Sequence, residues 1–248
     1  MGTRSSFQLH AFLQALFLIL SAAVFTVVIG IPALIVSVFD GSGQWTSLFQ
    51  KAWVFCLLRT NGIQVRAEGL ENLKEGGAFI LLANHASLLD IPGIVAATPL
   101  PVRFIAKKSL AWFPIFGWFM HAAGHVLIER ESTPSAMKSL KKASQLMKKG
   151  ISVIVFPEGT RSSDGEVKEF KRGAFLLAIQ SQAPIVPVSI SGTYEMLPRT
   201  GYCFRPGAIL LKIGPPIATQ GLPTHEARRL KEKVRNIIIN QKRNSFAA

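Results

Sequence analysis

Residues 79–90, with the sequence Phe-Ile-Leu-Leu-Ala-Asn-His-Ala-Ser-Leu-Leu-Asp, lead a short apolar run directly into a polar turn. An apolar run of this length, bounded by turn residues, is typical of a buried strand. Similar runs alternate with helical stretches from about residue 63 onward, which indicates an α/β layer fold. We predict strands over residues 63–66, 79–83, 103–106, 126–128, 152–156, 185–190 and 209–213.

The polar turn after this strand carries a candidate catalytic pair. Open α/β sheets place their sites at strand ends, and His85 stands there. A histidine can take a proton from an attacking hydroxyl, and Asp90 is the candidate partner that fixes its tautomer. Residues five apart lie about 140° apart on a regular helix. The pairing therefore requires a bent, non-helical start, which Asn84 and Pro92 favour.

A second strand, followed by residues 156–163, Phe-Pro-Glu-Gly-Thr-Arg-Ser-Ser, runs into a polar loop. Arg161 offers a planar fork suited to phosphate, and Thr160 and the loop N–H groups, including that of Gly159, can add donors. Glu158 either holds a substrate hydroxyl or anchors the loop by pairing with a basic neighbour, and the sequence leaves both open. We predict that this loop binds substrate.

The N-terminal part is suited to a membrane. Residues 11–39 contain no charged side chain, a run longer than the roughly 20 residues that span a bilayer. Gly30 and Pro32 predict an interruption, with a long helix to about Val28 and a shorter apolar piece over 33–39. A single tilted span and a helical hairpin both remain open. With a further apolar helix over residues 45–58, this predicts membrane-associated helices in residues 1–61 and an α/β catalytic domain in residues 62–248.

The charge balance limits the partners. The chain has a net charge of +14, and residues 1–50 contribute only Arg4 and Asp40 to it. A nucleic-acid partner is excluded because no interleaved aromatic residues and no recognisable binding module accompany the basic residues. A basic surface facing anionic membrane lipids fits, as does a phosphate-bearing substrate. The positive-inside rule places the globular part on the cytoplasmic face.

Two helices are well delimited within the α/β region. Residues 133–149 form one, whose lysine-rich face is either solvated or adjacent to lipid head groups, and residues 224–240 form the other, a docked cap. The helix over 224–240 has four apolar residues at core spacing: Leu230, Val234, Ile237 and Ile238.

Metal and cofactor chemistry is not expected. Cys56 and Cys203 give no disulfide framework or metal spacing, and Cys56 is expected to be a small buried hydrophobe. His121 and His125 lack an acidic co-ligand. Ser87 lacks the Gly-x-Ser-x-Gly elbow of a covalent nucleophile, so we predict a loop or cap role for it.

Several blocks, in order, resemble the PlsC-type 1-acyl-sn-glycerol-3-phosphate acyltransferase family. They are Asn84-His85-x4-Asp90, then residues 156–162 and then residues 185–188. Residues 106–110, followed by residues 113–118, resemble the family's second block, and residues 170–173 resemble the segment that trails the third. The resemblance covers roughly residues 62–216. Ser109 departs from a position that is often acidic, and His125 from one that is usually apolar.

The resemblance implies a mixed sheet flanked by helices, with an N-terminal membrane-anchoring element. It implies acyl transfer from acyl-CoA or acyl carrier protein to the sn-2 hydroxyl of 1-acylglycerol 3-phosphate (lysophosphatidic acid), giving phosphatidic acid without a cofactor. His85 would be the base and Asp90 its orienting partner. Arg161 would hold the phosphate, with Lys107 as a second cation and Lys171 and Arg172 as weaker candidates.

Three alternatives remain open at this point. The first is the same chemistry on another acceptor, such as a lysophospholipid or a lyso-aminolipid, or a lipid-to-lipid transacylation. The second is a thioester or lipid hydrolase in which His85 activates water. The third is a non-catalytic membrane scaffold.

Overall fold

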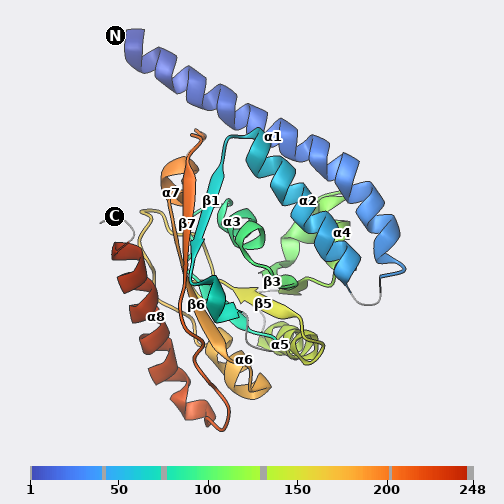
Figure 1. The fold of residues 1–248 in the computed structure, drawn as a ribbon, viewed down its shortest axis with the longest axis vertical. Helices are drawn as coiled ribbons and strands as arrows, with labels where there is room; N and C mark the ends of the chain where they lie inside the picture. The colour runs from blue at the N-terminus through green and yellow to red at the C-terminus, as the bar shows by residue number, and fades with distance from the viewer. Residues whose placement is uncertain (1, 41–42, 74–76, 129–132, 201–202, 245–248) are drawn as a thin grey trace.

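Seven strands form one mixed sheet at the centre of the molecule (Figure 1). The computed structural model describes residues 2–40, 43–73, 77–128, 133–200 and 203–244. The sheet order is β1-β7-β6-β2-β5-β3-β4, and every neighbouring pair is parallel except β6 and β7. All seven predicted strands are confirmed to within one or two residues at each end. The strands are β1 (Gln64–Glu68), β2 (Ile80–Ala83), β3 (Val102–Lys107), β4 (Val126–Ile128), β5 (Ser152–Val155), β6 (Ile185–Ser191) and β7 (Ala208–Ile213).

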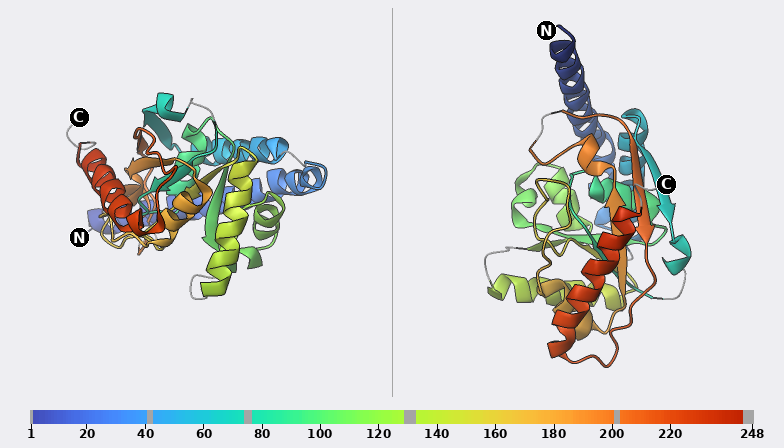
Figure 2. Two further views of the ribbon diagram at one scale, coloured as in Figure 1. Left: turned by 90° about the horizontal axis from the view of Figure 1, so that it is seen from below. Right: turned by 90° about the vertical axis from the view of Figure 1, so that its left-hand side faces the viewer.

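Helices cover both faces of the sheet (Figure 2). Successive strand residues point to opposite faces, so Leu81 joins one apolar cluster while Ile80 and Leu82 join another. The first cluster is covered by α1 (Gly2–Ser37), α2 (Gln44–Thr60), α3 (Asp90–Ala97) and α4 (Phe116–Ala122). The second is covered by α5 (Thr133–Lys148), α6 (Gly173–Ser181) and α8 (Ala227–Arg243). The remaining elements are η1 (Leu70–Leu73), η2 (Lys108–Trp112), α7 (Thr193–Met196) and η3 (Thr224–Glu226).

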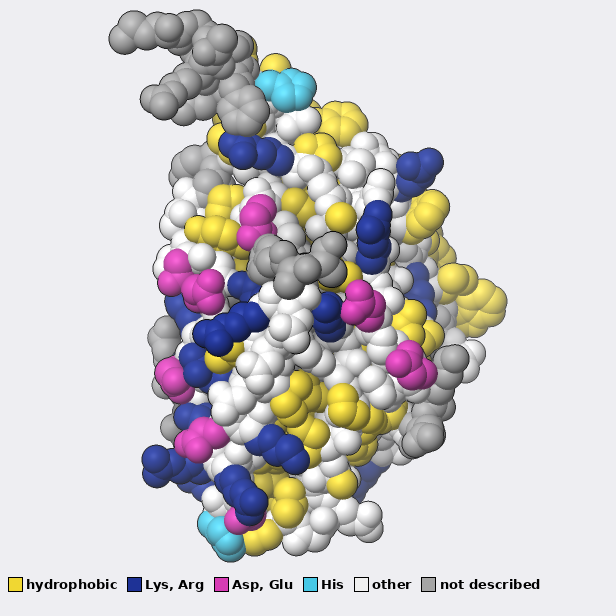
Figure 3. All heavy atoms as spheres, turned by 60° about the vertical axis from the view of Figure 1, so that its left-hand side comes forward, with side chains coloured by type: hydrophobic (Ala, Val, Ile, Leu, Met, Phe, Trp, Pro, Cys, Tyr) yellow, Lys and Arg dark blue, Asp and Glu magenta, His cyan; other side chains and the backbone are white. Residues whose placement is uncertain are grey.

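α8 is the docked, solvated cap that the sequence predicts. Leu230, Val234 and Ile238 are buried against the sheet, and Ile237 is half-buried. The outer arginines lie beside carboxylates, as in the Arg228–Glu232 pair. Figure 3 shows basic and acidic side chains mixed over the face that carries this helix, which is typical of a solvated surface.

The predicted interruption of the N-terminal helix is wrong. α1 runs without a break through Gly30 and Pro32 to Ser37, then the chain turns and α2 packs back against it. A proline inside a helix removes one backbone hydrogen bond, which neighbouring helices can offset by packing. That packing is present here, because Ala33 is buried and Gly30 lies against Ile115 of the α4 region. The second apolar helix, predicted over residues 45–58, is confirmed as α2.

α1 is suited to lipid contact. Its segment Leu9–Ser37 is long and apolar enough to cross a membrane. Large apolar side chains on its outer side are exposed, which is unusual for a helix in water. They include Phe12, Leu13, Leu16, Phe17, Ile19, Leu20, Val24, Val27, Val28, Ile31 and Ile35.

A buried arginine ties the turn between α1 and α2 to the sheet. Arg103 of β3 donates to the carbonyl of Gly43 at 3.0 Å and to the hydroxyl of Ser47 at 3.0 Å, and its Nε donates to the carbonyl of Ala123. Burial lowers the pKa of Arg103, and the carboxylate of Asp40 partly offsets this effect. The two N-terminal helices are therefore fixed to the domain by polar contacts as well as by the shared core.

Candidate functional site

His85 and Asp90 form a direct hydrogen bond at the end of β2. Nδ1 of His85 lies 2.7 Å from Oδ2 of Asp90, and residues 84–89 are non-helical before α3 begins at Asp90. The predicted bent start is thus present. A hydrogen bond from Nδ1–H to the carboxylate keeps the proton on Nδ1, so Nε2 carries the free lone pair of the neutral ring. The His85 ring also stacks on Phe156 at 4.1 Å, and its side chain is 13% exposed.

Asp90 is held by donors on both of its carboxylate oxygens. It is fully buried, and Oδ2 also accepts the backbone N–H groups of Ala86 and Ser87 at 2.8 and 2.9 Å. Oδ1 accepts the hydroxyl of Thr193 at 2.6 Å. Thr193 begins α7 after Gly192, whose φ of 87° and close approach to the carbonyl of Ala208 exclude a side chain. Thr193 could not be found from the sequence, because it lies 103 residues from Asp90 and carries no local motif.

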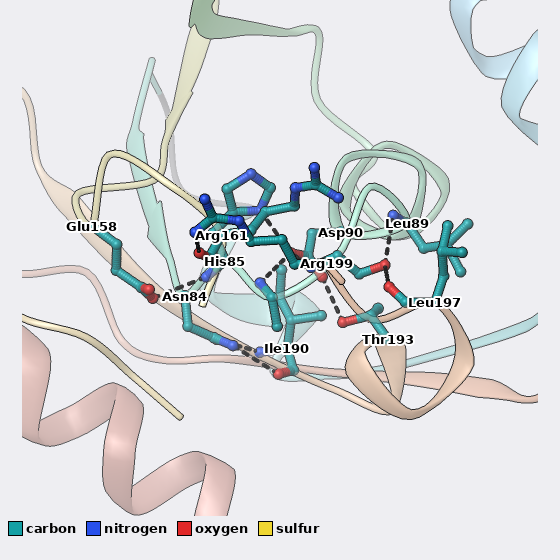
Figure 4. A network of polar contacts seen from close by, with 12 residues as sticks. Asn84, His85, Leu89, Asp90, Glu158, Arg161, Ile190, Thr193, Leu197 and Arg199 are labelled. Carbon is teal, nitrogen blue, oxygen red and sulfur yellow. Dashed lines mark hydrogen bonds and ion pairs between the residues drawn. The ribbon is translucent and has the colours of Figure 1, made fainter. Parts of the chain in front are cut away.

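Asn84 and Ser87 build the turn around this pair (Figure 4). The Asn84 side-chain amide exchanges two hydrogen bonds with the backbone of Ile190 in β6, at 2.9 and 2.7 Å. The Ser87 hydroxyl donates to the carbonyl of Leu197 at 2.7 Å and accepts the N–H of Leu89 at 3.2 Å. Ser87 is therefore a cap residue, as predicted, and not an exposed nucleophile.

Glu158 anchors its loop to the catalytic turn. Its Oε1 accepts the backbone N–H of His85 at 2.9 Å, and the side chain is buried. This contact favours the anchoring role over a hydroxyl-binding one. The partner at 2.9 Å is a backbone N–H, and the positive charge of Lys168 is the basic neighbour that the sequence suggested. Burial raises the pKa of Glu158 to about 7, against the lowering effect of the bond from His85.

This raised pKa predicts a pH-dependent stability. The folded protein holds the Glu158 proton more tightly than the unfolded chain does, so ionisation disfavours folding as pH rises from 4.5 to about 7. Across this window, we expect the free energy of unfolding of wild type to fall by about 3 kcal/mol relative to that of Glu158→Gln. The free energy of unfolding of detergent-solubilised protein would be measured at a series of pH values, from below 4.5 to above 7. Parallel curves for the two proteins would contradict the prediction.

Two arginines lie beside the His85 ring (Figure 4). Arg161 follows the Glu158 loop and is half-buried, and Arg199 donates to its carbonyl at 2.9 Å. Burial and the positive charge of Arg199 lower the pKa of Arg161, while Asp90 raises it. Two neighbouring guanidinium groups are suited to binding an anion. The sequence predicted Arg161 but missed Arg199, which follows α7 without a motif of its own.

The other predicted binding residues make fewer contacts with the turn that carries His85. Lys107 is exposed at the carboxyl end of β3, and Thr160 is exposed in the loop. Gly159 has a φ of 75° and lies against the Lys171 side chain. Arg172 donates to the carbonyl of Thr224 in η3 at 3.0 Å, a contact outside the His85 turn, which does not favour a role in the site.

His121, His125 and Cys56 lie outside the catalytic turn. His121 is exposed, whereas His125 is buried and its Nδ1 accepts the N–H of Phe104 at 3.1 Å. Cys56 is half-buried on α2, less than the full burial expected. Among the described residues, no group of three or more His, Cys, Asp or Glu side chains could hold a metal ion.

A large apolar cavity begins beside the catalytic turn. Its volume is about 640 Å³, and it lies between α1, α2, α3, α4 and β3. Leu88, Leu89 and Leu197 line it, and these residues flank Asp90 or bond to Ser87. The turn that carries His85 and Asp90 therefore forms part of the cavity wall. Its chemistry suits a hydrocarbon chain.

Comparisons with known proteins agree with this geometry. The sequence model of the family described as Acyltransferase matches residues 64–191. The chain is 37% identical over 159 residues to the 1-acyl-sn-glycerol-3-phosphate acyltransferase of Limnanthes douglasii, covering 64% of this chain and 56% of that protein. It is 33% identical over 179 residues to the human 1-acyl-sn-glycerol-3-phosphate acyltransferase alpha, covering 72% and 63%. The matched part thus spans about 56–63% of the length of these curated relatives.

A solved structure covers nearly the whole chain. The crystal structure of the 1-acyl-sn-glycerophosphate (LPA) acyltransferase PlsC from Thermotoga maritima superimposes with a TM-score of 0.80 at 31% sequence identity. The match covers 97% of this chain and 98% of the other. The similarity therefore extends through the N-terminal helices as well as the sheet.

Proposed function

Because the chain belongs to the PlsC-type acyltransferase family, we propose that it transfers a fatty acyl group to the sn-2 hydroxyl of 1-acylglycerol 3-phosphate, giving phosphatidic acid. The observation that carries this proposal is the 2.7 Å contact between His85 Nδ1 and Asp90 Oδ2. It leaves Nε2 as a base at the mouth of a polar site, with two arginines on one side and an apolar cavity nearby. The donor would be acyl-CoA or acyl carrier protein, with no cofactor.

The transfer would be direct. His85 Nε2 accepts the proton of the acceptor hydroxyl while the hydroxyl oxygen forms a bond to the thioester carbonyl carbon. As the C–S bond breaks, the imidazolium returns this proton to the departing sulfur. Asp90 stabilises the imidazolium between the two steps, and its four hydrogen bonds prevent it from turning away.

Arg161 and Arg199 would bind the acceptor phosphate. A phosphate dianion between two guanidinium groups relieves their repulsion and forms charge-assisted hydrogen bonds. Lys107 at the end of β3 would add a third positive charge at the same edge of the sheet. The apolar cavity would hold an acyl chain, and α1 would attach the protein to the membrane from the cytoplasmic side.

The test of the function uses purified protein in mixed micelles. Labelled acyl-CoA or acyl carrier protein thioester is supplied with 1-acylglycerol 3-phosphate, and both phosphatidic acid and free fatty acid are followed. We expect phosphatidic acid to form and free fatty acid to stay at the level of the protein-free control. Free fatty acid formed without phosphatidic acid would instead identify a hydrolase, and no product with either donor would reject this acceptor.

The phosphate site predicts a change in KM. We expect Arg161→Gln and Arg199→Gln each to raise the KM for the phosphorylated acceptor about 10-fold to 100-fold, because each removes a charge-assisted hydrogen bond. The KM for the acyl donor should change little. Initial rates over an acceptor series measure the effect. The control is Arg228→Gln on the exposed side of α8. Equal KM values for the acceptor in Arg199→Gln and the control would show that Arg199 does not bind the phosphate.

A further inference from the structure

Gln50 is a polar residue at a position of α2 that packs inward. It is only 7% exposed, and the part of the chain that the structure describes offers no hydrogen-bond partner to either Oε1 or Nε2 of its amide. A buried amide without a partner destabilises a protein relative to an apolar side chain of the same size. The buried face of α2 comprises Thr46, Gln50, Val54, Leu57 and Leu58. Three of the four other residues on this face are apolar, so stability does not explain the presence of a glutamine here.

The Gln50 side chain lines the apolar cavity. Two other polar side chains that line it, those of Thr26 and His125, already use their acceptor atoms in hydrogen bonds. The Thr26 hydroxyl donates to the carbonyl of Ala22 and accepts from Trp53 Nε1. His125 accepts the N–H of Phe104 at Nδ1, and burial lowers its pKa well below the usual range, so the neutral ring has its proton on Nε2. The Gln50 amide differs from both, because its donor and its acceptor are free together.

The position of Gln50 along the cavity follows from the sheet register. Ser47, less than one helical turn before Gln50, bonds to Arg103 in the first half of β3. Arg103 is level with Val153, which is level with Ile80 of β2. His85 follows Ile80 by five residues, so Gln50 lies roughly 10 Å from the level of His85 along the strands once the helical rise is subtracted. A ligand group that reaches the amide is therefore several carbons away from the reacting thioester.

We propose that Gln50 binds a hydroxyl group in the middle or distal part of the acyl chain, so that the enzyme selects hydroxylated acyl chains. A hydroxyl both donates and accepts, which satisfies Oε1 and Nε2 together. A keto group satisfies only Nε2, and an unsubstituted chain satisfies neither. The inference rests on the proposed acyl-transfer function and specifies the donor that this function uses.

The experiment is a competition between acyl donors of equal length. Each mixture contains the unsubstituted thioester and one that carries a single hydroxyl, placed at successive carbons from the third to the terminal one. The ratio of the two lipid products is the readout, so a general change in rate cancels. The proteins are wild type, Gln50→Met, which removes both polar atoms at similar shape, and Gln180→Met, a matched control on the exposed side of α6.

We expect one mid-chain or distal hydroxyl to be favoured about tenfold more by wild type than by Gln50→Met, the factor that one additional buried hydrogen bond typically gives. Gln180→Met should behave as wild type, and the 3-hydroxy donor should show no preference. The same product ratio in wild type and Gln50→Met at every hydroxyl position would overturn the proposal and leave a bound water as the partner of the amide.

Two further measurements distinguish a failure of this inference from misfolding of the variant and from a failure of the proposed function. Gln50→Met should unfold at or above the wild-type temperature, and a large decrease would show a structural partner for the amide and overturn the proposal. If wild type transfers no acyl group at all, the proposed function fails by itself. Displacement of a fluorescent fatty acid by hydroxylated and unsubstituted fatty acids then decides the inference, and equal affinities in wild type and Gln50→Met would overturn it.

Discussion

His85→Ala is expected to lower kcat/KM for phosphatidic acid formation by about 10³-fold to 10⁴-fold, because it removes the only group positioned to take the proton of the attacking hydroxyl within the described site. The cavity and the arginine pair remain, so the KM for the acceptor should change much less than kcat. Steady-state assays in mixed micelles with varied donor and acceptor concentrations separate the two parameters.

The structure offers a matched control for this variant. His225 is an exposed histidine in η3, at the opposite end of the domain from the N-terminal helices, and His225→Ala should retain wild-type activity. Residual activity of His85→Ala within tenfold of wild type would reject His85 as the base. An equal loss in both variants would point to a general effect on the protein and not to the proton transfer.

Asp90→Asn is expected to lower kcat by about 10³-fold while leaving the protein folded. If the asparagine carbonyl faces the donors of His85, Ala86 and Ser87, the new NH₂ group faces Thr193, whose hydroxyl can turn to accept it. The hydrogen bonds survive in this arrangement, whereas the negative charge that stabilises the imidazolium is lost. Single-turnover kinetics and an unfolding curve measure the two effects.

Thr193→Val is the comparison that isolates this charge. It removes the donor to Oδ1 but keeps the carboxylate and the size of the side chain, so we expect a loss of only about tenfold. Thr193 acts through Asp90 and is a positioning residue. If Asp90→Asn and Thr193→Val lowered kcat equally, the charge would not be the important property, and the role assigned to Asp90 would be wrong.

The sequence predicted the parts of the fold that are locally encoded. β2, β5 and β6 are fully buried and mainly apolar, and parallel strands covered on both faces have this pattern. The antiparallel pairing of β7 with β6 has no equivalent local signal. The continuation of α1 through Pro32 depends on packing against α2 and the α4 region, which a proline rule applied to one segment cannot include.

The site shows the same division. His85 and Asp90 lie five residues apart and are visible as a motif, whereas Thr193 and Arg199 approach them from more than 100 residues away. Glu158 was identified, but its bond to the backbone N–H of His85 was not, because side-chain pairing cannot reveal a backbone partner. Gln50 had a signal that could have been used, since it is a single amide within an apolar face of a helix.

Because α1 forms one wall of the cavity, this helix must be kept when the protein is produced. Ala15 and Leu18 of α1 belong to the same core as the sheet, and Ser21 accepts a hydrogen bond from the buried Asn61 at 2.9 Å. A shortened gene product beginning after residue 37, made to avoid detergent, would expose one side of the cavity as an open apolar trough. Such a fragment should aggregate or bind detergent nonspecifically. Crystallisation and screening projects are therefore better served by lipid nanodiscs containing the whole chain.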